Sequence, residues 1–426
     1  KRQPLTLWTY CVETSDTKLI FFANDLGMFF NCKMVRVLRG FGGLAGLAVG
    51  LFVAWPNAEA GDSPKATSID WAKARKWWAF QPPVKLKLPA VSNSAWPSQQ
   101  LDYFVLAKIE AQQLTISPQA SKRVLLRRLF LDLTGLPPTP DEMAVFLADE
   151  TNDAYERLVE ELMQRKAFGE RLASMWLNNV RYAEDQAHQV GGNTAFFYPN
   201  AFRYREWVID AFNDDLPYNE FIRKQLAADL LQGISSRDLP ALGFIGLGHK
   251  YYDRNRLAVK AEEWAEQVDT LTRSLLGLTV ACAQCHDHKY DPFSMRDYYR
   301  MFAFFNNTPL EVKQQGNGVT WNFYGPTINL PMPPGLEARR AELQEKINEL
   351  QASKGSGEAL KREISKLSNE KEAIKPPSTL VMKEISEPRD TKIMLRGNYL
   401  TLGDSVAVGT PTVMHAYDKK LPPNRL

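Results

Sequence analysis

Four side chains that can bind metals or form covalent bonds lie close together between residues 281 and 293, in the run A-C-A-Q-C-H-D-H-K-Y-D-P-F. They are Cys282, Cys285, His286 and His288. Two cysteines three positions apart, followed directly by a histidine, form the C-x-x-C-H pattern of c-type haem attachment. Cysteines at this spacing lie on the same side of a helical turn. The sequence therefore predicts one covalent haem c, attached at Cys282 and Cys285, with His286 as the iron ligand.

Two other kinds of site are compatible with the same residues. A Cys-x-x-Cys pair can form a redox disulfide, or half of a zinc site completed by His286, His288 or Asp291. A zinc ribbon would require a second Cys or His pair at a distance, and a thioredoxin-like motif would follow a strand, whereas the preceding segment has a helical pattern. We therefore rank haem first, zinc or another metal second and a disulfide third. His288 is predicted to be a hydrogen-bonding partner and not a ligand.

The bulk composition is that of an ordinary globular protein. The chain has 426 residues, of which 44% are hydrophobic and 24% charged, and its formal net charge is +3. This length is ample for a large core. The small net charge gives no electrostatic footprint for nucleic acid, so we expect no nucleic-acid partner.

The N-terminal region resembles an export signal preceded by unrelated sequence. The chain opens on Lys1, and we interpret residues 1–33 as translated upstream sequence. Residues 34–60 combine basic residues, an apolar run over 41–53 and the triplet Ala-Glu-Ala at 58–60, which predicts a signal peptide cleaved after Ala60. Cleavage would leave no stable membrane span and place the protein in the periplasm or at the cell surface; an uncleaved anchor is the alternative. It would also remove Cys11 and Cys32.

The rest of the sequence predicts a mainly α fold. Residues 61–100 form a Trp- and Pro-rich lead-in whose tryptophans we expect to pack on the domain, and residues 101–312 form a multi-helix globular domain. Helices are predicted to begin at Ser117-Pro118 and at the capping box Thr139 to Glu142. One long helix over 262–280 would lead into the cysteines, and a capping box at 294–297 would open an aromatic helix beyond them.

The C-terminal part has two further patterns. Apolar residues at near-heptad spacing over 336–375, on either side of a Gly/Ser tip at 353–357, predict an antiparallel helical hairpin. We interpret this hairpin as a spacer or as an arm for self-association or for partner helices. Residues 376–426 alternate around Arg396-Gly397-Asn398-Tyr399 and predict a small β-rich segment that joins a further domain.

Several long motifs together resemble one family. They are W-A-F-Q-P-P at 78–83, D-L-T-G-L-P-P-T-P at 132–140, R-Y-A-E-D at 181–185, the stretch 204–226 and the cysteine motif itself. This combination is similar to the exported planctomycete proteins of the domain of unknown function 1549 family, which is associated with planctomycete cytochrome c modules. The resemblance covers about residues 70–310. It implies haem attachment at Cys282 and Cys285 with His286 as the proximal ligand, and a following domain of unknown function 1553, whose opening the last six residues resemble.

We therefore expect an exported c-type haem protein that acts in periplasmic electron transfer or as the redox component of a larger assembly, with an unidentified redox partner. Candidates for the sixth iron ligand are His188, His249, His288, Met295 and Met301, of which we favour His249. One alternative is a non-redox, carbohydrate-associated binding or structural module with a zinc or disulfide site. Another is a hydrolase that uses carboxylates at 181–185 and Asp291, although no spacing connects these groups.

Overall fold

The structure is a computed structural model that describes residues 69–185, 198–248, 260–309, 326–353, 357–418, 420–422 and 424–426, together with the backbone alone of 11–14, 17–20 and 257–259. Two compact units divide the chain at residue 65. In the first, strands β1 (Cys11–Thr14) and β2 (Thr17–Ile20) pair antiparallel. The predicted signal peptide at 34–60 lies outside the described residues. The second unit, residues 66–426, carries the elements that position the cysteines.

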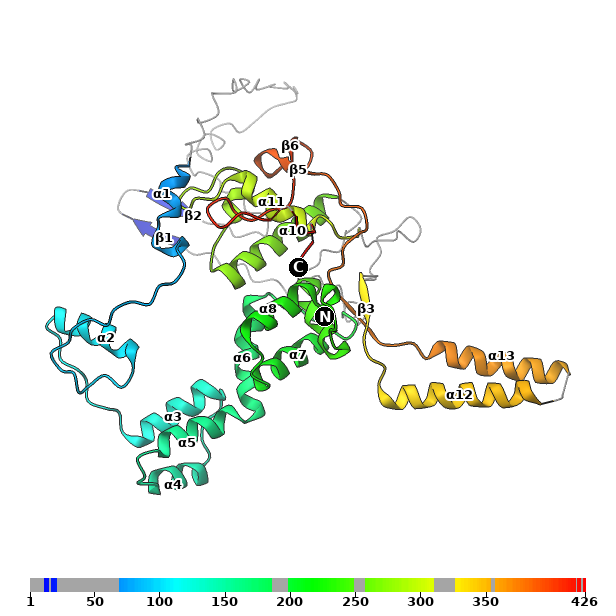
Figure 1. Cartoon of the computed structure of the whole chain (residues 1–426), viewed down its shortest axis with the longest axis horizontal. Coiled ribbons are helices and arrows are strands. Elements are labelled where there is room, and N and C mark those ends of the chain that lie inside the picture. Colours follow the sequence, from blue (N-terminus) through cyan, green and yellow to red (C-terminus); the bar gives the residue numbers. More distant parts are fainter. Residues whose placement is uncertain are drawn as a thin grey trace, which may run out of the picture. The chain divides into compact units, whose positions relative to one another are not determined.

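The described part of the second unit is mainly α, with small two-stranded sheets, as the sequence predicts (Figure 1). Its helices up to the cysteine motif are α1 (Trp71–Arg75), α2 (Gln100–Ala111), α3 (Lys122–Leu133), α4 (Pro140–Ala148), α5 (Ala154–Met163), α6 (Lys166–Asn179), α7 (Phe202–Asn213), α8 (Tyr218–Ala227), α9 (Gly243–Gly246) and α10 (Leu257–Leu271). Four short helical segments lie between them. The segment η2 (Trp78–Phe80) follows α1, η4 (Ala228–Leu230) follows α8, η5 (Ser236–Leu242) precedes α9, and the π turn η6 (Thr272–Leu276) follows α10. The motif begins in the 3₁₀ helix η7 (Ala281–Gln284), and α11 (Met295–Phe305) comes directly after it.

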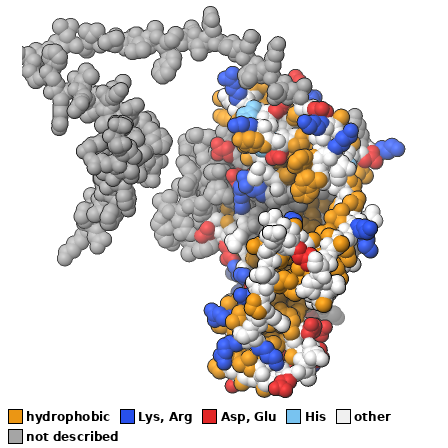
Figure 2. Space-filling view, turned by 90° about the vertical axis from the view of Figure 1, so that its left-hand side faces the viewer, with side chains coloured by type: hydrophobic (Ala, Val, Ile, Leu, Met, Phe, Trp, Pro, Cys, Tyr) orange, Lys and Arg blue, Asp and Glu red, His pale blue; other side chains and the backbone are white. Residues whose placement is uncertain are grey.

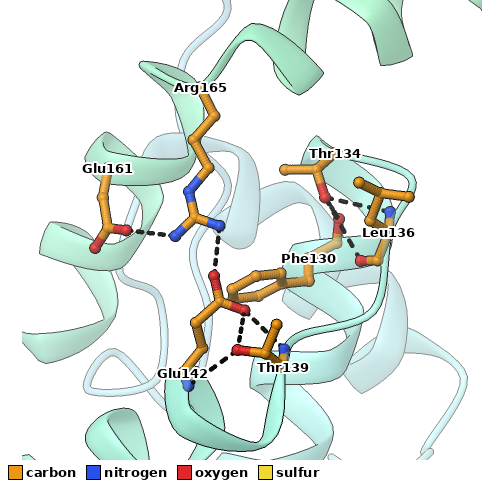
Figure 3. A network of polar contacts seen from close by, with 7 residues as sticks. All are labelled: Phe130, Thr134, Leu136, Thr139, Glu142, Glu161 and Arg165. Atoms are coloured by element: carbon orange, nitrogen blue, oxygen red, sulfur yellow. Dashed lines mark hydrogen bonds and ion pairs between the residues drawn. The ribbon is translucent and has the colours of Figure 1, made fainter.

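Helices α3, α4 and α5 enclose a small core of their own, which contains Leu126, Leu129, Phe130, Phe146, Ala154 and Leu162. The predicted capping box begins α4: the Thr139 hydroxyl accepts from the Glu142 backbone N–H at 3.3 Å, and Glu142 accepts from the Thr139 N–H at 2.7 Å. Arg165 then joins Glu142 to Glu161 across the helices (Figure 3). By contrast, the predicted start at Ser117-Pro118 is wrong, because α3 begins at Lys122 after Ser121.

A larger core is shared by helices α6 to α11 and by the C-terminal strands. Close backbone contact fixes its arrangement. Because Gly169 of α6 has no Cβ, α7 can approach α6 closely. A Cβ at this position would clash with Ile209 O of α7 at 2.5 Å. The Trp176 indole donates at 2.9 Å to Gln225, whose carbonyl also accepts from the Tyr204 hydroxyl at 2.7 Å. These buried bonds tie α6, α7 and α8 together.

The helix before the cysteines is shorter than the sequence predicts. Helix α10 ends at Leu271, a single π turn follows, and Gly277 then takes a left-handed φ of 64° as the C-cap. Glycine adopts this backbone conformation without the steric penalty of a Cβ, which is why helices often end at one. The prediction of one helix over 262–280 is therefore wrong. Residues 277–280 form a connection between η6 and η7.

The lead-in also differs from its prediction. Trp71 packs against the main core, but Trp77 and Trp78 are exposed, Trp78 by 77% of its surface. Phe80 replaces them as the anchor, because its ring meets that of Phe293 edge-on at 6.3 Å between centroids. The expectation that the tryptophans as a group pack on the domain is therefore wrong.

Beyond α11, the predicted helical hairpin is present. Helices α12 (Pro334–Ala352) and α13 (Glu358–Ala373) lie side by side, with Leu343 and Ile347 buried between them (Figure 1). Strand β3 (Thr327–Asn329) pairs with β4 (Ser378–Leu380) at the base of the hairpin. The second C-terminal pair is β5 (Thr391–Met394) and β6 (Leu402–Val406), joined through the short helix η8 (Leu395–Gly397).

The C-terminal segment returns to the helical domain. The Arg425 side chain is 4% exposed and binds Asp229 at 2.8 Å and Glu384 at 3.1 Å. A Cβ on Gly246 of α9 would lie 2.3 Å from the Val381 Cα, so the backbones after β4 and within α9 touch. The segment after residue 376 therefore packs as part of the same unit.

The surface mixes charges of both signs. Figure 2 shows Lys and Arg side chains interleaved with Asp and Glu on the face drawn, with no large field of one sign among the described residues there. Separately, within the described ranges no helix has both the length and the apolar character needed to cross a membrane.

Candidate cysteine and histidine site

The motif lies in a compact turn between η7 and α11. In η7 the Ala283 N–H donates to Val280 O at 2.8 Å, and the Cys285 N–H lies 3.4 Å from Cys282 O. In a 3₁₀ helix the side chains at i and i+3 are eclipsed, so Cys282 and Cys285 fall on the same side of the turn. The sequence predicts a helical turn at this point, and the structure has a short 3₁₀ helix with Cys285 as its C-cap.

Both thiols are free and both residues are exposed. The side between them and the core is filled by Ala283, which is fully buried. No disulfide joins Cys282 and Cys285.

His286 is exposed, and its Nδ1 lies 2.7 Å from the Asp287 carbonyl oxygen. Because a carbonyl only accepts, Nδ1 must carry the proton in this bond. The Nε2 lone pair is then available to a metal, as in metal-bound histidines whose other nitrogen donates to a carbonyl. This local bond both orients the ring and selects its tautomer.

His288 has a different role. Its side chain is 6% exposed, and Nδ1 accepts from the Asp291 backbone N–H at 2.8 Å. The backbone N–H of His288 donates to Phe293 O at 2.8 Å. The imidazole thus closes the turn over residues 288–293. This agrees with the prediction that His288 is a hydrogen-bonding partner.

Helix α11 is the support beneath the motif. Its predicted capping box is present, with Ser294 and Asp297 bonded in both directions. Asp287 accepts from the Met295 N–H at 2.8 Å, which fixes the motif to the first turn of α11. The aromatic face of α11 is buried, with Tyr298, Tyr299, Phe302 and Phe305 in the main core.

Tyr299 connects the motif to a strand about a hundred residues away. Its hydroxyl oxygen lies 3.0 Å from Gln284 O and 3.1 Å from Met394 O of β5. Burial raises the pKa of Tyr299, with a further contribution from Cys285, so the phenol keeps its proton and donates it between the two carbonyls.

The turn between β5 and β6 lies against the second cysteine. Gly397 has a φ of 73°, and a Cβ built on it would lie 2.8 Å from Cys285 Sγ. The sulfur therefore occupies space that would belong to a side chain at any residue other than glycine. Cys285 has a protein wall on this side and solvent on another.

The remaining predicted candidates are distributed elsewhere. His249, favoured as sixth ligand, and His188 lie outside the described residues. Met301 is 5% exposed within the main core, and Met295 is half-buried at the start of α11.

The charged cluster at 181–185 forms ion pairs between helices. Arg181 pairs with Glu266 and Asp269 of α10, and Glu184 pairs with Arg205 of α7. The Tyr182 hydroxyl donates to Glu184 at 2.8 Å, and burial raises the pKa of Tyr182 to about 12, which keeps it a donor. These ion pairs hold neighbouring helices together.

Two grooves in the described part of the chain are not lined by the cysteines. One of about 530 Å³ lies between α7, η5 and residues 330–334. A second of about 640 Å³ has Phe80 and Pro82 on one wall and residues 413–415 on the other. Across the described segments, no three His, Cys, Asp or Glu side chains converge closely enough to hold a metal ion.

The donor set of the motif fits covalent haem. Haem attachment needs two free thiols on one side of a turn and one imidazole with an available nitrogen, and Cys282, Cys285 and His286 provide them. Unlike a structural zinc site, this arrangement needs no further cysteine or histidine close by in the fold.

Three residues that contact the motif were not identified from the sequence. They are Tyr299, Met394 and Gly397. The Arg-Gly-Asn-Tyr run at 396–399 was read as the centre of a β-rich segment, but nothing in its spacing relates it to Cys285. The glycine itself is the signal that the sequence offers, and it indicates a turn without identifying what the turn contacts.

Comparison with known proteins matches one family. Residues 100–309 match PSCyt2, described as a protein of unknown function (DUF1549). Neither the curated proteins nor the solved structures gave a match. The matched range contains α2 to α11 and the whole cysteine motif, whereas α12, α13 and β3 to β6 lie beyond it. Through residues 100–309, the chain belongs to the DUF1549 family.

Proposed function

We propose that Cys282, Cys285 and His286 hold one covalently attached haem, and that the protein carries electrons outside the cytoplasm, in the periplasm or at the cell surface, as a redox component of a larger assembly. The observation that carries this proposal is local: two free, exposed thiols share one side of a 3₁₀ turn, and the adjacent imidazole has its Nδ1 hydrogen-bonded and its Nε2 available. The resemblance to exported planctomycete cytochrome-associated proteins supports it.

Each residue of the motif has one task in this proposal. Cys282 and Cys285 would hold the porphyrin through thioether bonds, and His286 Nε2 would bind the iron on its proximal side. The Asp287 carbonyl holds the imidazole in the required tautomer. Haem bound there would supply one-electron chemistry. His249 is our proposed sixth ligand.

The test is expression of the full chain in a host with c-type haem maturation, followed by an absorption spectrum, a pyridine haemochrome assay and intact mass. We expect a Soret band and a haem-sized mass increase that survives denaturation. Cys282→Ser and Cys285→Ser should each lose one thioether, and the double variant should lose all covalent haem. His415→Ala, which removes an exposed histidine far along the chain, is the matched control and should keep it.

His286→Ala should change the spectrum of the iron without removing both thioethers. Binding of carbon monoxide to the reduced protein would report an open sixth position, and His249→Ala should create one if His249 is the ligand. A colourless product of unmodified mass, from cells that mature a control cytochrome, would contradict the proposal. Zinc found by metal analysis of that product would favour the non-redox alternative.

A further inference from the structure

The turn that joins β5 to β6, residues 395–401, forms a wall beside Cys285. The residue of the turn that contacts this cysteine is Gly397. A Cβ built on Gly397 would lie 2.8 Å from Cys285 Sγ, so the sulfur occupies the space next to the glycine. The other atoms nearest to that position belong to Gln284, and none belongs to Cys282. The two thiols of the motif therefore differ in their surroundings although both are exposed.

The backbone of this turn is strained at one residue and closed by a hydrogen bond of its own. Arg396 and Gly397 both have left-handed φ values, 55° and 73°. Glycine adopts this region freely, but arginine does so only where surrounding contacts compensate. Within the turn, the Leu395 N–H donates to Thr401 O at 2.8 Å.

Several hydrogen bonds hold the segment that carries the turn against α11. Tyr299 joins Met394 to Gln284 within the motif. At the other end of α11, the Asn306 amide donates to Thr391 Oγ1 at 3.0 Å. At the beginning of α11, Asp297 accepts from the Thr412 N–H at 2.9 Å. The wall is thus fixed on both sides of the turn to the helix that supports the cysteines.

We propose that this C-terminal turn, which lies outside the family-matched range, restrains Cys285 and makes the two thiols unequal, so that thiol chemistry at the motif begins at Cys282. Cys285 reacts after its side chain rotates off Gly397 or the turn moves. Any ligand attached through both sulfurs would bind Cys282 first. The inference concerns the reduced chain itself and does not depend on haem attachment.

The test is the rate at which iodoacetamide alkylates each cysteine in the folded, reduced full-length chain, read by peptide mass spectrometry. Intrinsic thiol reactivity affects the absolute rates, so the measured quantity is the change in the Cys285 to Cys282 ratio between variants. Tyr299→Phe removes the hydroxyl that holds the motif to β5, and loss of a hydrogen bond of ordinary strength should raise the Cys285 rate about fivefold. The Cys282 rate should stay unchanged.

Gly397→Ala is the second variant. Its methyl group must displace Cys285 Sγ, the end of a side chain with one rotatable bond, and should turn the sulfur toward solvent and raise the same ratio. Two glycines provide controls: Gly277→Ala strains a positive φ with nothing within 4 Å, and Gly403→Ala adds a methyl group to the same hairpin next to Leu395 and not Cys285. Neither control should change the ratio.

Circular dichroism and a thermal melt confirm that each variant is folded, and Tyr299→Phe decides the matter if Gly397→Ala does not fold. An unchanged ratio in Tyr299→Phe would overturn the inference. So would an equal rise at both cysteines, because that would report general loosening instead of a wall specific to Cys285. Either result leaves the haem proposal standing, since its assay is separate.

Discussion

At the scale of single residues, the motif contains two histidines with opposite surroundings. His286 is exposed with a free ring nitrogen, while His288 is buried and uses Nδ1 as an acceptor. Their separation of two positions turns one side chain outward and the other into the turn. The proposed iron ligand and the residue that supports the loop are thus histidines two positions apart.

This division leads to a prediction for His288. His288→Ala should lower the free energy of unfolding by about 1 kcal/mol, because the half-buried Asp291 N–H loses its acceptor. His288→Asn should recover part of the loss, since an amide oxygen can take the place of Nδ1. The measurement is denaturant unfolding, with the exposed His415→Ala as control. Equal stability of the wild type and His288→Ala would show that this hydrogen bond does not contribute to the free energy of unfolding.

Residue-scale features within a few positions of one another were readable from the sequence. The Cys-x-x-Cys-His spacing, the Thr139 and Ser294 capping boxes and the role of His288 all depend on contacts that the local chain makes with itself. Gly397 was not readable in this way. Its importance comes from a sulfur that approaches it through the tertiary fold, and no local pattern encodes that approach.

At the scale of elements, helix ends decide where the site begins. The apolar spacing through Leu271, Leu275 and Leu276 continues a helical pattern toward the cysteines, yet Gly277 ends the helix with its left-handed cap. Periodicity indicated which face is buried, and the glycine was the stop signal. Because the motif then starts a new 3₁₀ turn, its orientation is set by α11 after it more than by α10 before it.

The capping box of α4 gives a prediction about pH. Partial burial tends to raise the pKa of Glu142, but hydrogen bonds from the Thr139 backbone and from Arg165 outweigh it, and the pKa lies below its usual 4.5. A lowered carboxyl pKa stabilises the fold above 4.5, and this contribution is lost as the pH falls through the folded-state value. Glu142→Gln should therefore be destabilised at neutral pH and converge on the wild type in acid.

Denaturant unfolding at neutral pH and well below 4.5 measures this difference. Glu161→Gln is the matched control, because Glu161 binds the same Arg165 but is largely exposed and outside the box (Figure 3). Exposed ion pairs contribute little, so its pH profile should follow the wild type. A constant gap between Glu142→Gln and the wild type at all pH values would contradict the assignment.

At the scale of the whole molecule, the second unit is larger than the family-matched range. Residues after 376 fill positions in the same core as α6 to α11, including Leu380, Met382, Ile393 and Val413. The composition and the heptad spacing predicted a helical domain, a hairpin and a strand-rich end as separate stretches. Their packing into one core could not be predicted, because it depends on pairs of residues far apart in sequence.

A substitution at the contact between Gly246 and Val381 tests whether the C-terminal segment packs on α9. Gly246→Ala would place a Cβ 2.3 Å from a backbone atom that no rotamer change can move, so we expect a loss of about 1–3 kcal/mol or more in stability. Gly335→Ala, in α12 with nothing within 4 Å, is the control and should be neutral or stabilising. Calorimetry of both variants measures the difference. An unaffected Gly246→Ala protein would mean that the C-terminal segment does not press on α9.

The wall beside Cys285 forms only after the cysteines have been synthesised. A ribosome makes the cysteines first, and Gly397 follows only after about 110 further residues, which takes roughly 5–20 s at ordinary elongation rates. During that interval the nascent motif has neither the turn nor the strand that Tyr299 bonds. An enzyme that modifies the motif during synthesis would therefore meet two equivalent thiols, whereas one that acts on the finished chain would meet a pair in which one partner is already restrained.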